Sequence, residues 1–319
     1  MKTRILLTIG DFNGIGPEII LKSLSNRSLT KKYDLTVLSP VSVLEFYAKH
    51  LRKKVYADDF NVIPVGTEKI KISPGKISAE AGSFAGLAIV KAVEMCMDKE
   101  YDAIVTAPIS KEALNKGGFN YGGHTDMLRD FGNAKEVCMI MVSDKIKVAL
   151  ATNHPPIKKV SSALTREMLQ NKLKICCSSL KNDFAVSSPE IGVLALNPHA
   201  GDGGVIGNEE QKTINPVVKA LKKKYGNKAF SFSLAADAYF ASNTYRNYDL
   251  TFAMYHDQGL IPFKMLAGMD GINYTAGLGF VRTSPDHGTA FDIAGKNSAG
   301  EKSFILAIKW ADRIFRNRK

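Results

Sequence analysis

The chain is poor in cysteine and has no long apolar run. Four cysteines occur in 319 residues, none of them in a Cys-x-x-Cys pair. This argues against a disulfide framework or a cysteine zinc site and predicts reduced, buried thiols. No apolar run reaches the roughly 18 residues that span a bilayer, and the run that follows Arg4 is too short for a signal peptide. We therefore expect a cytoplasmic protein with no membrane partner.

The positive charge lacks the pattern of a nucleic-acid-binding protein. The formal net charge is +12, which in general favours an anionic ligand or nucleic acid. The basic residues are scattered, however, and the clusters at 222–224 and 313–319 lie at a predicted helix end and at the chain end, where cations complement the helix dipole. No aromatic RNA-binding signature accompanies them. Nucleic-acid binding is kept only as an alternative, which predicts binding that falls steeply with salt.

The usual nucleotide-binding fingerprints are also missing. The sequence has neither G-x-G-x-x-G at the start of a βαβ unit nor a P-loop, so a conventional Rossmann site is disfavoured. In their place, residues 10–18 read Gly-Asp-Phe-Asn-Gly-Ile-Gly-Pro-Glu between a predicted strand and a predicted helix. Proline in the first helical turn, preceded by glycines, suggests an anion-binding loop at a helix N-terminus.

Strand-like and helix-like segments alternate along the chain, which predicts a mostly parallel sheet covered by helices. With 45% hydrophobic residues, the chain can bury one large core or two ordinary ones. Strands are expected at residues 4–9, 35–38, 102–106, 137–142, 147–152, 191–196 and 250–254. Helices are expected at residues 17–24, 41–51, 81–97, 111–115, 166–180, 209–224 and 302–315. The glycine-rich stretch 117–123 is the best candidate for a crossing between lobes.

Three of the expected strands run into a loop that delivers a histidine. The sequence has only six histidines, and His154, His199 and His256 occupy these equivalent positions. A lone histidine is more often a hydrogen-bonded surface or core residue. Because ligand sites gather at the carboxyl ends of parallel strands, the three imidazoles are predicted to meet around one divalent cation. Asp257 could orient a ligand or take part in proton transfer.

A second group of residues has the chemistry of a phosphate receptor. Lys264 and Arg282 each follow an apolar pair, and His124-Thr125 follow two glycines. Together with Asn273 they offer positive charge and several donors to a small, highly charged anion. Taken singly, each cation would more often be a surface charge.

Six blocks of residues follow one another through nearly the whole chain. They are Gly10-Asp11-x-x-Gly14-Ile15-Gly16-Pro17-Glu18, Thr106-Ala107-Pro108-Ile109-x-Lys111-Glu112, Gly123-His124-Thr125, Asn197-Pro198-His199-Ala200-Gly201 with Gly207-x-Glu209-Glu210, Tyr255-His256-Asp257-Gln258-Gly259, and Arg282-Thr283-Ser284-x-Asp286-His287-Gly288-Thr289-Ala290. In order and spacing they resemble the signatures of the 4-hydroxythreonine-4-phosphate dehydrogenase family. Phe12-Asn13, Ser110, Asn153 and Pro155 depart from the family's usual pattern and leave fine specificity open.

The resemblance implies an α/β fold of the two-lobed isopropylmalate/isocitrate dehydrogenase type, with a mostly parallel sheet and an interlobe cleft. It implies an NAD-binding lobe at residues 1–118 plus 268–319, and a central metal, substrate and dimerisation lobe at residues 119–267. A homodimer in which the partner completes each active site is implied as well.

The same resemblance implies roles for individual residues. One divalent metal (Zn, Mg, Co, Mn or Ni) would be held by His154, His199 and His256, with Asp257 as the candidate catalytic residue. The substrate would be bound by His124, Thr125, Lys264, Asn273 and Arg282. NAD, or NADP, would be bound by His287, Gly288, Thr289 and Asp292.

The implied reaction is the NAD- and metal-dependent oxidation and decarboxylation of 4-phosphooxy-L-threonine to 3-amino-2-oxopropyl phosphate, in pyridoxal 5'-phosphate (vitamin B6) biosynthesis. A sister enzyme that acts on a phosphorylated four-carbon sugar acid or on a cyclic diol dicarboxylate remains an alternative. Lys264 and Arg282 disfavour the unphosphorylated diol.

Overall fold

The computed structural model describes residues 2–51, 60–66 and 70–319, which divide into two compact units. Unit 1 comprises Met1–Lys135, Leu278–Asn317 and Lys319, and unit 2 comprises Glu136–Gly277 and Arg318. The chain passes between the units at 135/136 and 277/278, so the glycine-rich stretch 117–123 lies inside unit 1. The lobes expected at 1–118 with 268–319, and at 119–267, stay a prediction about domains.

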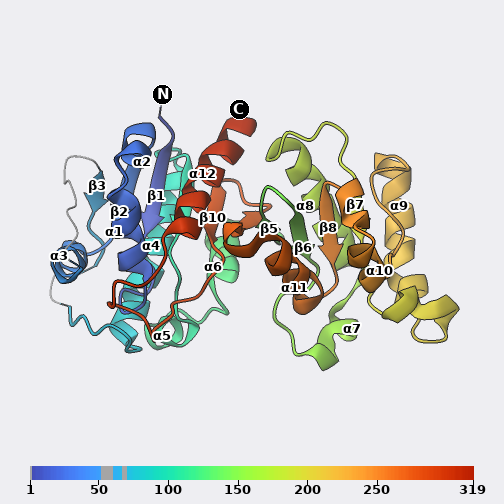
Figure 1. Cartoon of the computed structure of the whole chain (residues 1–319), viewed down its shortest axis with the longest axis horizontal. Coiled ribbons are helices and arrows are strands. Elements are labelled where there is room, and N and C mark those ends of the chain that lie inside the picture. Colours follow the sequence, from blue (N-terminus) through green and yellow to red (C-terminus); the bar gives the residue numbers. More distant parts are fainter. Residues whose placement is uncertain (1, 52–59, 67–69) are drawn as a thin grey trace. The chain divides into compact units, whose positions relative to one another are not determined.

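The described part of unit 1 contains a parallel sheet with the strand order β3-β2-β1-β4-β10. The strands are β1 (Arg4–Thr8), β2 (Asp34–Leu38), β3 (Asn61–Ile63), β4 (Ala103–Thr106) and β10 (Val281–Pro285). The helices of unit 1 in Figure 1 are α1 (Gly16–Leu24), α2 (Arg27–Lys32), α3 (Val41–His50), α4 (Ala79–Met97), α5 (Lys111–Lys116), α6 (His124–Phe131) and α12 (Lys302–Asn317). Because α4 and α12 both pack on β1 and β4, these strands are buried along nearly their whole length.

Helix α12 shows how the sequence pattern sets the packing that positions β10. Phe304, Ile308 and Ala311 recur at helical spacing and are all fully buried. The stripe lies against the sheet, where the Thr283 hydroxyl of β10 donates to the carbonyl of Ala307 (2.8 Å). The predicted helix at 302–315 is thus confirmed, and it fixes the strand on which Arg282 lies.

Unit 2 contains strands in the order β9-β5-β6-β8-β7. Its strands are β5 (Cys138–Val142), β6 (Lys147–Leu150), β7 (Ile191–Val193), β8 (Leu250–Ala253) and β9 (Ile272–Ala276). Strand β5 is antiparallel to β6 and β9, whereas β6-β8-β7 are parallel. Its longer helices are α8 (Arg166–Asn182), α9 (Asn215–Tyr225) and α11 (His256–Ala267). Short helical pieces are α7 (Val160–Ala163), α10 (Ala236–Ala241), the 3₁₀ segments Ile157–Lys159, Pro198–Gly204, Thr244–Asn247 and Gly268–Asp270, and the π-helical turn Glu210–Ile214.

The elements that differ from the expectation have local causes. Strands β3, β9 and β10 and helices α2 and α6 were not expected. In β9 and β10, polar residues such as Asn273 and Arg282 interrupt the apolar pattern. The helix expected at 209–224 is divided into a π-helical turn and α9. Pro216, which has no backbone N–H, lies in the first turn of α9, where a helix tolerates it.

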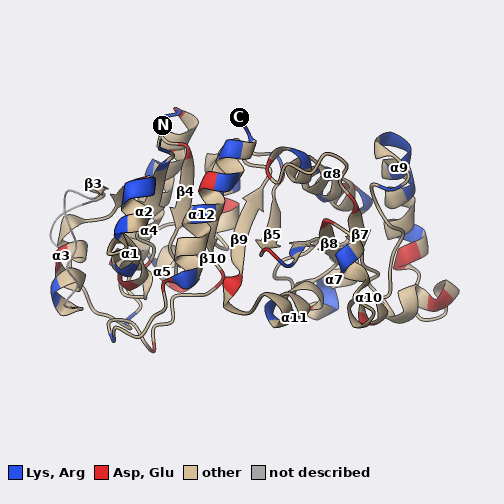
Figure 2. Cartoon of the chain, turned by 45° about the horizontal axis from the view of Figure 1, so that its top comes forward, with Lys and Arg blue, Asp and Glu red and all other residues tan. Residues whose placement is uncertain are grey.

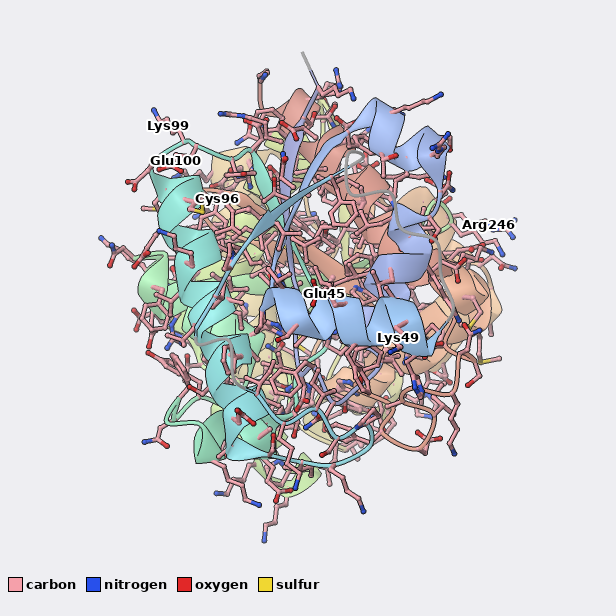
Figure 3. All side chains as sticks on the ribbon, turned by 90° about the vertical axis from the view of Figure 1, so that its left-hand side faces the viewer. Glu45, Lys49, Cys96, Lys99, Glu100 and Arg246 are labelled. Atoms are coloured by element: carbon pink, nitrogen blue, oxygen red, sulfur yellow. The ribbon has the colours of Figure 1, made fainter. Side chains whose placement is uncertain are left out.

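The cysteines are free and buried, as the sequence predicts. All four are buried thiols. Cys96 lies near the C-terminal end of α4, close to Lys99 and Glu100 (Figure 3), and burial raises the pKa of its thiol to about 12. Such a thiol is protonated and unreactive at neutral pH.

The charged residues are spread over the elements of both units. Figure 2 shows Lys and Arg on many helices, among them α9 and the end of α12, interspersed with Asp and Glu. Within the described ranges, no helix is long and apolar enough to cross a membrane.

The loop between β1 and α1 holds a carboxylate of the chain itself where the sequence suggests an external anion. Asn13 N donates to the Asp11 carboxylate (2.9 Å), and Gly14 N donates to the Asp11 carbonyl (3.0 Å). Ile15 N donates to the Thr289 carbonyl (3.0 Å), so the amides of Asn13, Gly14 and Ile15 are engaged by the chain itself. Asp11 is fully buried, and burial raises its pKa to about 6 although the loop amides act in the opposite direction. The expected anion-binding role of this loop stays a prediction.

Replacing Asp11 by asparagine removes a buried charge and keeps an oxygen that accepts from Asn13. The folded pKa of about 6 exceeds the reference value of 3.8, so ionisation of Asp11 destabilises the fold increasingly between these pH values and by a constant amount above them. Two pKa units correspond to about 3 kcal/mol. We expect the stability advantage of Asp11→Asn over the wild type, measured by urea unfolding, to be larger at pH 8 than at pH 4 by an amount of that order. Equal differences at the two pH values would contradict the buried-charge explanation.

Candidate active site

The most deeply buried cation among the expected site residues is Arg282, on β10. The residue is 2% exposed. Because β10 pairs with β4 in parallel, its guanidinium reaches the Thr106 hydroxyl at the end of β4, with distances of 3.2 Å from Nε and 2.6 Å from Nη2. Burial lowers the pKa of Arg282 to about 9. A neighbouring anion would therefore stabilise its charged form.

His124 lies close enough to this arginine to respond to its charge. It is the first residue of α6 and follows Gly123, whose φ of 150° suits glycine. Its ring Nε2 is buried and has no hydrogen-bond partner among the described residues. Burial, and then the charge of Arg282, lower the pKa of His124 well below its ordinary value. A neutral imidazole, a buried guanidinium and the N-terminus of α6 together suit a phosphate group, and half-buried Thr125 adds a hydroxyl.

The other two expected substrate residues belong to unit 2. Lys264 is exposed in the last turn of α11. Asn273 is half-buried on β9, and its Oδ1 is buried without a hydrogen-bond partner in the part of the chain that the structure describes. The structure thus brings together His124, Thr125 and Arg282 within unit 1. That Lys264 and Asn273 contact the same substrate stays a prediction.

The expected cofactor residues lie in one loop of unit 1, between β10 and α12. The carbonyl of Thr289 accepts from Ile15 N, and a Cβ added to Gly14 would lie 2.9 Å from the same oxygen. The loop is therefore held closely against the β1–α1 loop. Within it, His287 is half-buried, while Gly288 and Asp292 are exposed. A carboxylate at this position could accept from the hydroxyls of a ribose, as in many dinucleotide sites, and cofactor binding by this loop stays a prediction.

Two of the three expected metal histidines are neighbours in unit 2. His154 follows β6 and His256 begins α11 just after β8, and these two strands pair in parallel. Their ring centroids are 5.5 Å apart, and the ring planes are inclined by 42°. Both side chains are at least partly exposed. The strand-end argument thus places two imidazoles side by side at one edge of this sheet.

His199 lies in a turn of unusual backbone geometry. The turn is the 3₁₀ segment Pro198–Gly204 after β7, and residues 199–203 all have positive φ angles, between 42° and 82°. Among residues 2–51, 60–66 and 70–319, no group of three or more His, Cys, Asp or Glu side chains is placed so that it could hold a metal ion. A single chain therefore brings His154 together with His256 and leaves His199 outside this pair. Metal binding by all three stays a prediction.

Asp257 orients the ring of His256. The imidazole Nδ1 lies 2.7 Å from the Asp257 carboxylate. A carboxylate on Nδ1 leaves Nε2 for a ligand, as is common for metal-bound histidines. The Asp257 side chain is 71% exposed, so it can exchange protons with solvent.

Strands β6, β8 and β7 are neighbours (Figure 1), and two polar side chains connect their ends. Thr152 donates from its N (3.2 Å) and its hydroxyl (2.8 Å) to the Met254 carbonyl. Gln258 accepts from Met254 N (2.7 Å) and donates to the Ala195 carbonyl (2.6 Å). These bonds satisfy backbone groups beyond the strand ends. They also fix the starting points of the three histidine loops relative to one another.

Sequence reasoning assigned no role to Thr106, Gln258 or Glu210. Each lies within one of the motif blocks, and Gln258 directly follows Asp257. The Glu210 carboxylate is buried and accepts from the backbone N of Leu196 and Asn197. Membership of a motif block was the available signal. Only the folded chain shows which backbone groups it satisfies.

These features define a two-unit α/β protein with a buried cationic receptor in one unit and a surface pair of imidazoles in the other. A family model described as "Pyridoxal phosphate biosynthetic protein PdxA" matches residues 18–311. The chain is 40% identical to 4-hydroxythreonine-4-phosphate dehydrogenase of Bacteroides thetaiotaomicron, over 100% of this chain and 90% of that protein. It is 43% identical to the protein of that name from Prosthecochloris aestuarii, over 98% and 97% of the two chains. The chain therefore belongs to the PdxA family, which confirms the resemblance found in the sequence.

A relative whose name states a different substrate is aligned over an equally large share of both chains. D-Threonate 4-phosphate dehydrogenase of Pectobacterium atrosepticum is 36% identical, over 98% of this chain and 100% of that protein. The relatives of this chain are therefore named for more than one phosphorylated substrate.

Solved structures agree with this assignment. The crystal structure of 4-hydroxythreonine-4-phosphate dehydrogenase from Klebsiella pneumoniae superposes with a TM-score of 0.86 at 32% identity, covering 98% of this chain and 100% of that one. A β-decarboxylating dehydrogenase from Thermococcus kodakarensis gives a TM-score of 0.52 at 16% identity, covering 96% and 81%. The second likeness concerns the fold alone, and it confirms the expected isopropylmalate/isocitrate dehydrogenase type.

Replacing Gln258 by leucine leaves the Met254 N–H and the Ala195 carbonyl without their partner. An unsatisfied buried group costs about 1–3 kcal/mol, so we expect Gln258→Leu to be destabilised by about 2 kcal/mol or more. The matched control is Gln170→Leu on α8, a position whose side chain makes no hydrogen bond in the described part of the chain. Urea unfolding followed by circular dichroism compares the two. If both variants unfold at the wild-type urea concentration, the bridge does not stabilise the strand ends.

Proposed function

We propose that the chain is a cytoplasmic NAD-dependent oxidoreductase that converts 4-phosphooxy-L-threonine to 3-amino-2-oxopropyl phosphate during pyridoxal 5'-phosphate biosynthesis. The observation that carries the proposal is the arrangement of Arg282 and His124, which combines a buried cation with an unpartnered imidazole nitrogen at a helix N-terminus. A phosphate group has the charge and the acceptors that such a receptor requires. The names of the relatives support the reaction.

Binding of the phosphate positions the other end of the substrate. Arg282 donates to the phosphate oxygens, and Thr106 keeps the guanidinium oriented. Because the phosphate does not react, its binding energy serves to hold the reacting carbon in place. In the proposal Thr125, Lys264 and Asn273 complete the contacts to the substrate.

The reaction oxidises a hydroxyl-bearing carbon and then removes the neighbouring carboxylate. NAD, or NADP, would supply the hydride acceptor, and His287, Gly288, Thr289 and Asp292 form the loop proposed to bind its adenosine half. A divalent cation, when bound, would supply Lewis acidity for the substrate hydroxyl and for the developing negative charge. Asp257 is the candidate acceptor of the hydroxyl proton. Carbon dioxide then leaves because the oxidised substrate is a β-keto acid.

The residues present suit such a cation by type and in part by position. His154 and His256 offer two adjacent imidazoles, and imidazole binds Zn, Co and Ni well, while a chelating substrate with oxygen donors also admits Mg or Mn. In the proposed homodimer, a second copy supplies the third imidazole, from His199.

Exposed apolar side chains support this homodimer. Several large apolar residues of unit 2 that lie within a few residues of the three histidines are exposed: Ile157, Val205, Ile206, Ile261 and Met265. Exposed apolar groups of this size often mark a protein interface. A second copy that covered them would approach the histidine loops.

A second candidate is the oxidation of a phosphorylated four-carbon sugar acid. The 36% identity to a D-threonate 4-phosphate dehydrogenase favours it, and the phosphate receptor would serve both substrates. NADH formation with 4-phosphooxy-L-threonine, with D-threonate 4-phosphate and with a cis-dihydrodiol dicarboxylate distinguishes these functions. We expect the first substrate to give the highest kcat/KM, and turnover of the diol alone would overturn the phosphate assignment.

Removal of the Arg282 guanidinium tests the phosphate receptor. A charged hydrogen bond contributes about 1.5–3 kcal/mol, so Arg282→Met is expected to lower kcat/KM for the phosphorylated substrate about 10- to 100-fold. Arg27→Met, at an exposed position of α2, is the matched control and should behave as the wild type. An unchanged KM for Arg282→Met would rule out this arginine as the phosphate ligand.

Metal binding by the histidine pair is tested without turnover. After treatment with a chelator and dialysis against Co²⁺, the wild type is expected to retain metal, and His256→Ala to retain at least tenfold less, since a ligand is lost. His50→Ala, in which the removed ring lies at the end of α3 in unit 1, controls for non-specific binding. Elemental analysis gives the metal content. Equal content in all three proteins would contradict the proposed metal site.

A further inference from the structure

We infer that Glu210 is a positioning residue whose buried carboxylate holds His199 in the left-handed turn from which this imidazole binds metal. The inference rests on the proposed metal site and extends it to the histidine that lies apart from the other two. Four observations in unit 2 carry it: the strain of the turn, the donors to Glu210, the close approach of Gly201, and the link to the loop of His154.

The turn that carries His199 is strained. Six successive residues, 199–204, have positive φ, and three of them, His199 (53°), Ala200 (54°) and Asp202 (42°), have a Cβ that disfavours this conformation. The left-handed conformation costs such residues about 1–2 kcal/mol each. A segment of this kind persists only where its surroundings determine its conformation, and it is found preferentially at functional sites.

The Glu210 carboxylate binds the entrance of the turn. Its Oε1 accepts from the backbone N of Leu196 (2.8 Å) and Asn197 (2.9 Å), and its Oε2 accepts from the Asn197 side-chain amide (3.0 Å). Glu210 is 1% exposed, so these bonds are shielded from water. All three donors lie one or two residues before Pro198, where the chain enters the turn.

The same carboxylate also contacts the middle of the turn. A Cβ added to Gly201 would lie 2.7 Å from Glu210 Oε2 and 2.5 Å from the Gly207 carbonyl. The turn is closed on itself by Ile206 N, which donates to the Gly201 carbonyl (3.2 Å). Glu210 therefore determines both the direction in which the chain enters the turn and the path that it takes through residue 201.

Glu210 begins the π-helical turn Glu210–Ile214. Turns of this kind occur frequently at functional sites. The preceding residue, Glu209, accepts from the Asn197 amide (2.7 Å) and from the Ser161 hydroxyl (2.6 Å). Ser161 lies seven residues after His154, so the two glutamates connect the loops of two expected ligands.

These contacts predict how His199 behaves without the carboxylate. His199 is exposed, and the backbone of the turn sets the direction in which its side chain leaves the chain. In Glu210→Gln the new amide group faces the Asn197 amide, donor against donor, and the charge that attracts three N–H groups is gone. The turn can then relax toward ordinary backbone conformations. Loss of a residue that orients a ligand typically weakens metal binding about 10- to 100-fold.

Co²⁺ titration of the metal-free enzyme tests the inference. Four proteins are compared: the wild type, Glu210→Gln, His199→Ala and the double variant. We expect Glu210→Gln to weaken Co²⁺ binding about 10- to 100-fold, and to have no further effect once His199 is alanine, because the carboxylate acts through that ring. Glu167→Gln, at an exposed position of α8, is the matched control and should bind as the wild type.

The outcomes separate this inference from the proposed function. If His199→Ala binds Co²⁺ as tightly as the wild type, the proposed three-histidine metal site itself is wrong. If His199→Ala weakens binding and Glu210→Gln does not, or if Glu210→Gln has the same effect in both backgrounds, Glu210 does not position His199. Should Glu210→Gln fail to fold, Gly201→Ala disturbs the same contact from the other side and is expected to show the same dependence on His199.

Discussion

The backbone groups at the ends of β6, β7 and β8 are the constraint on which the candidate site of unit 2 depends. Where a strand stops, its N–H and C=O groups lose their neighbours, and leaving them buried without partners costs about 1–3 kcal/mol each. Thr152 and Gln258 satisfy such groups at Met254 and Ala195, and Glu210 does so at Leu196 and Asn197. The loops that carry the three histidines therefore start from fixed positions, set by side chains with no expected contact to a ligand.

In unit 1 the main energetic constraint is the burial of charged side chains. Asp11 and Arg282 are both almost inaccessible to water. Burial raises the pKa of Asp11 and lowers the pKa of Arg282, so in each case it favours the neutral form. For Asp11 the loop amides counteract this effect, so the carboxylate serves the structure of its own loop. For Arg282 the loss of water is what determines the pKa, and the nearby imidazole of His124 adds no negative charge. A receptor of this kind is desolvated before an anion arrives, which favours binding of a small, highly charged group.

Features that follow from regular geometry could be predicted from the sequence, whereas features that depend on irregular backbone could not. Apolar spacing predicted α12 and the strand-end argument predicted that His154 and His256 meet, because both follow from regular geometry. Family membership also followed from the motif blocks. The position of His199 could not be predicted, because a left-handed run that includes histidine, alanine and aspartate has no signal in residue propensity. Strands β9 and β10 were missed because polar residues such as Asn273 and Arg282 weaken their apolar pattern.

The rigidity of the His199 turn bears on how a metal site with three imidazoles would be completed. One route is a movement of the turn toward His154 and His256 within the same chain. This movement would break the three hydrogen bonds to the buried Glu210 carboxylate and leave its charge without donors, a loss of several kcal/mol. The other route leaves the turn in place and brings a second copy of the chain to it, and the exposed apolar side chains near the same loops would then be buried at no loss of hydrogen bonds. The proposed homodimer therefore completes the site at a lower cost in free energy. In that arrangement the strained turn has a function, because it would hold the exposed imidazole of His199 in one direction before the second copy binds.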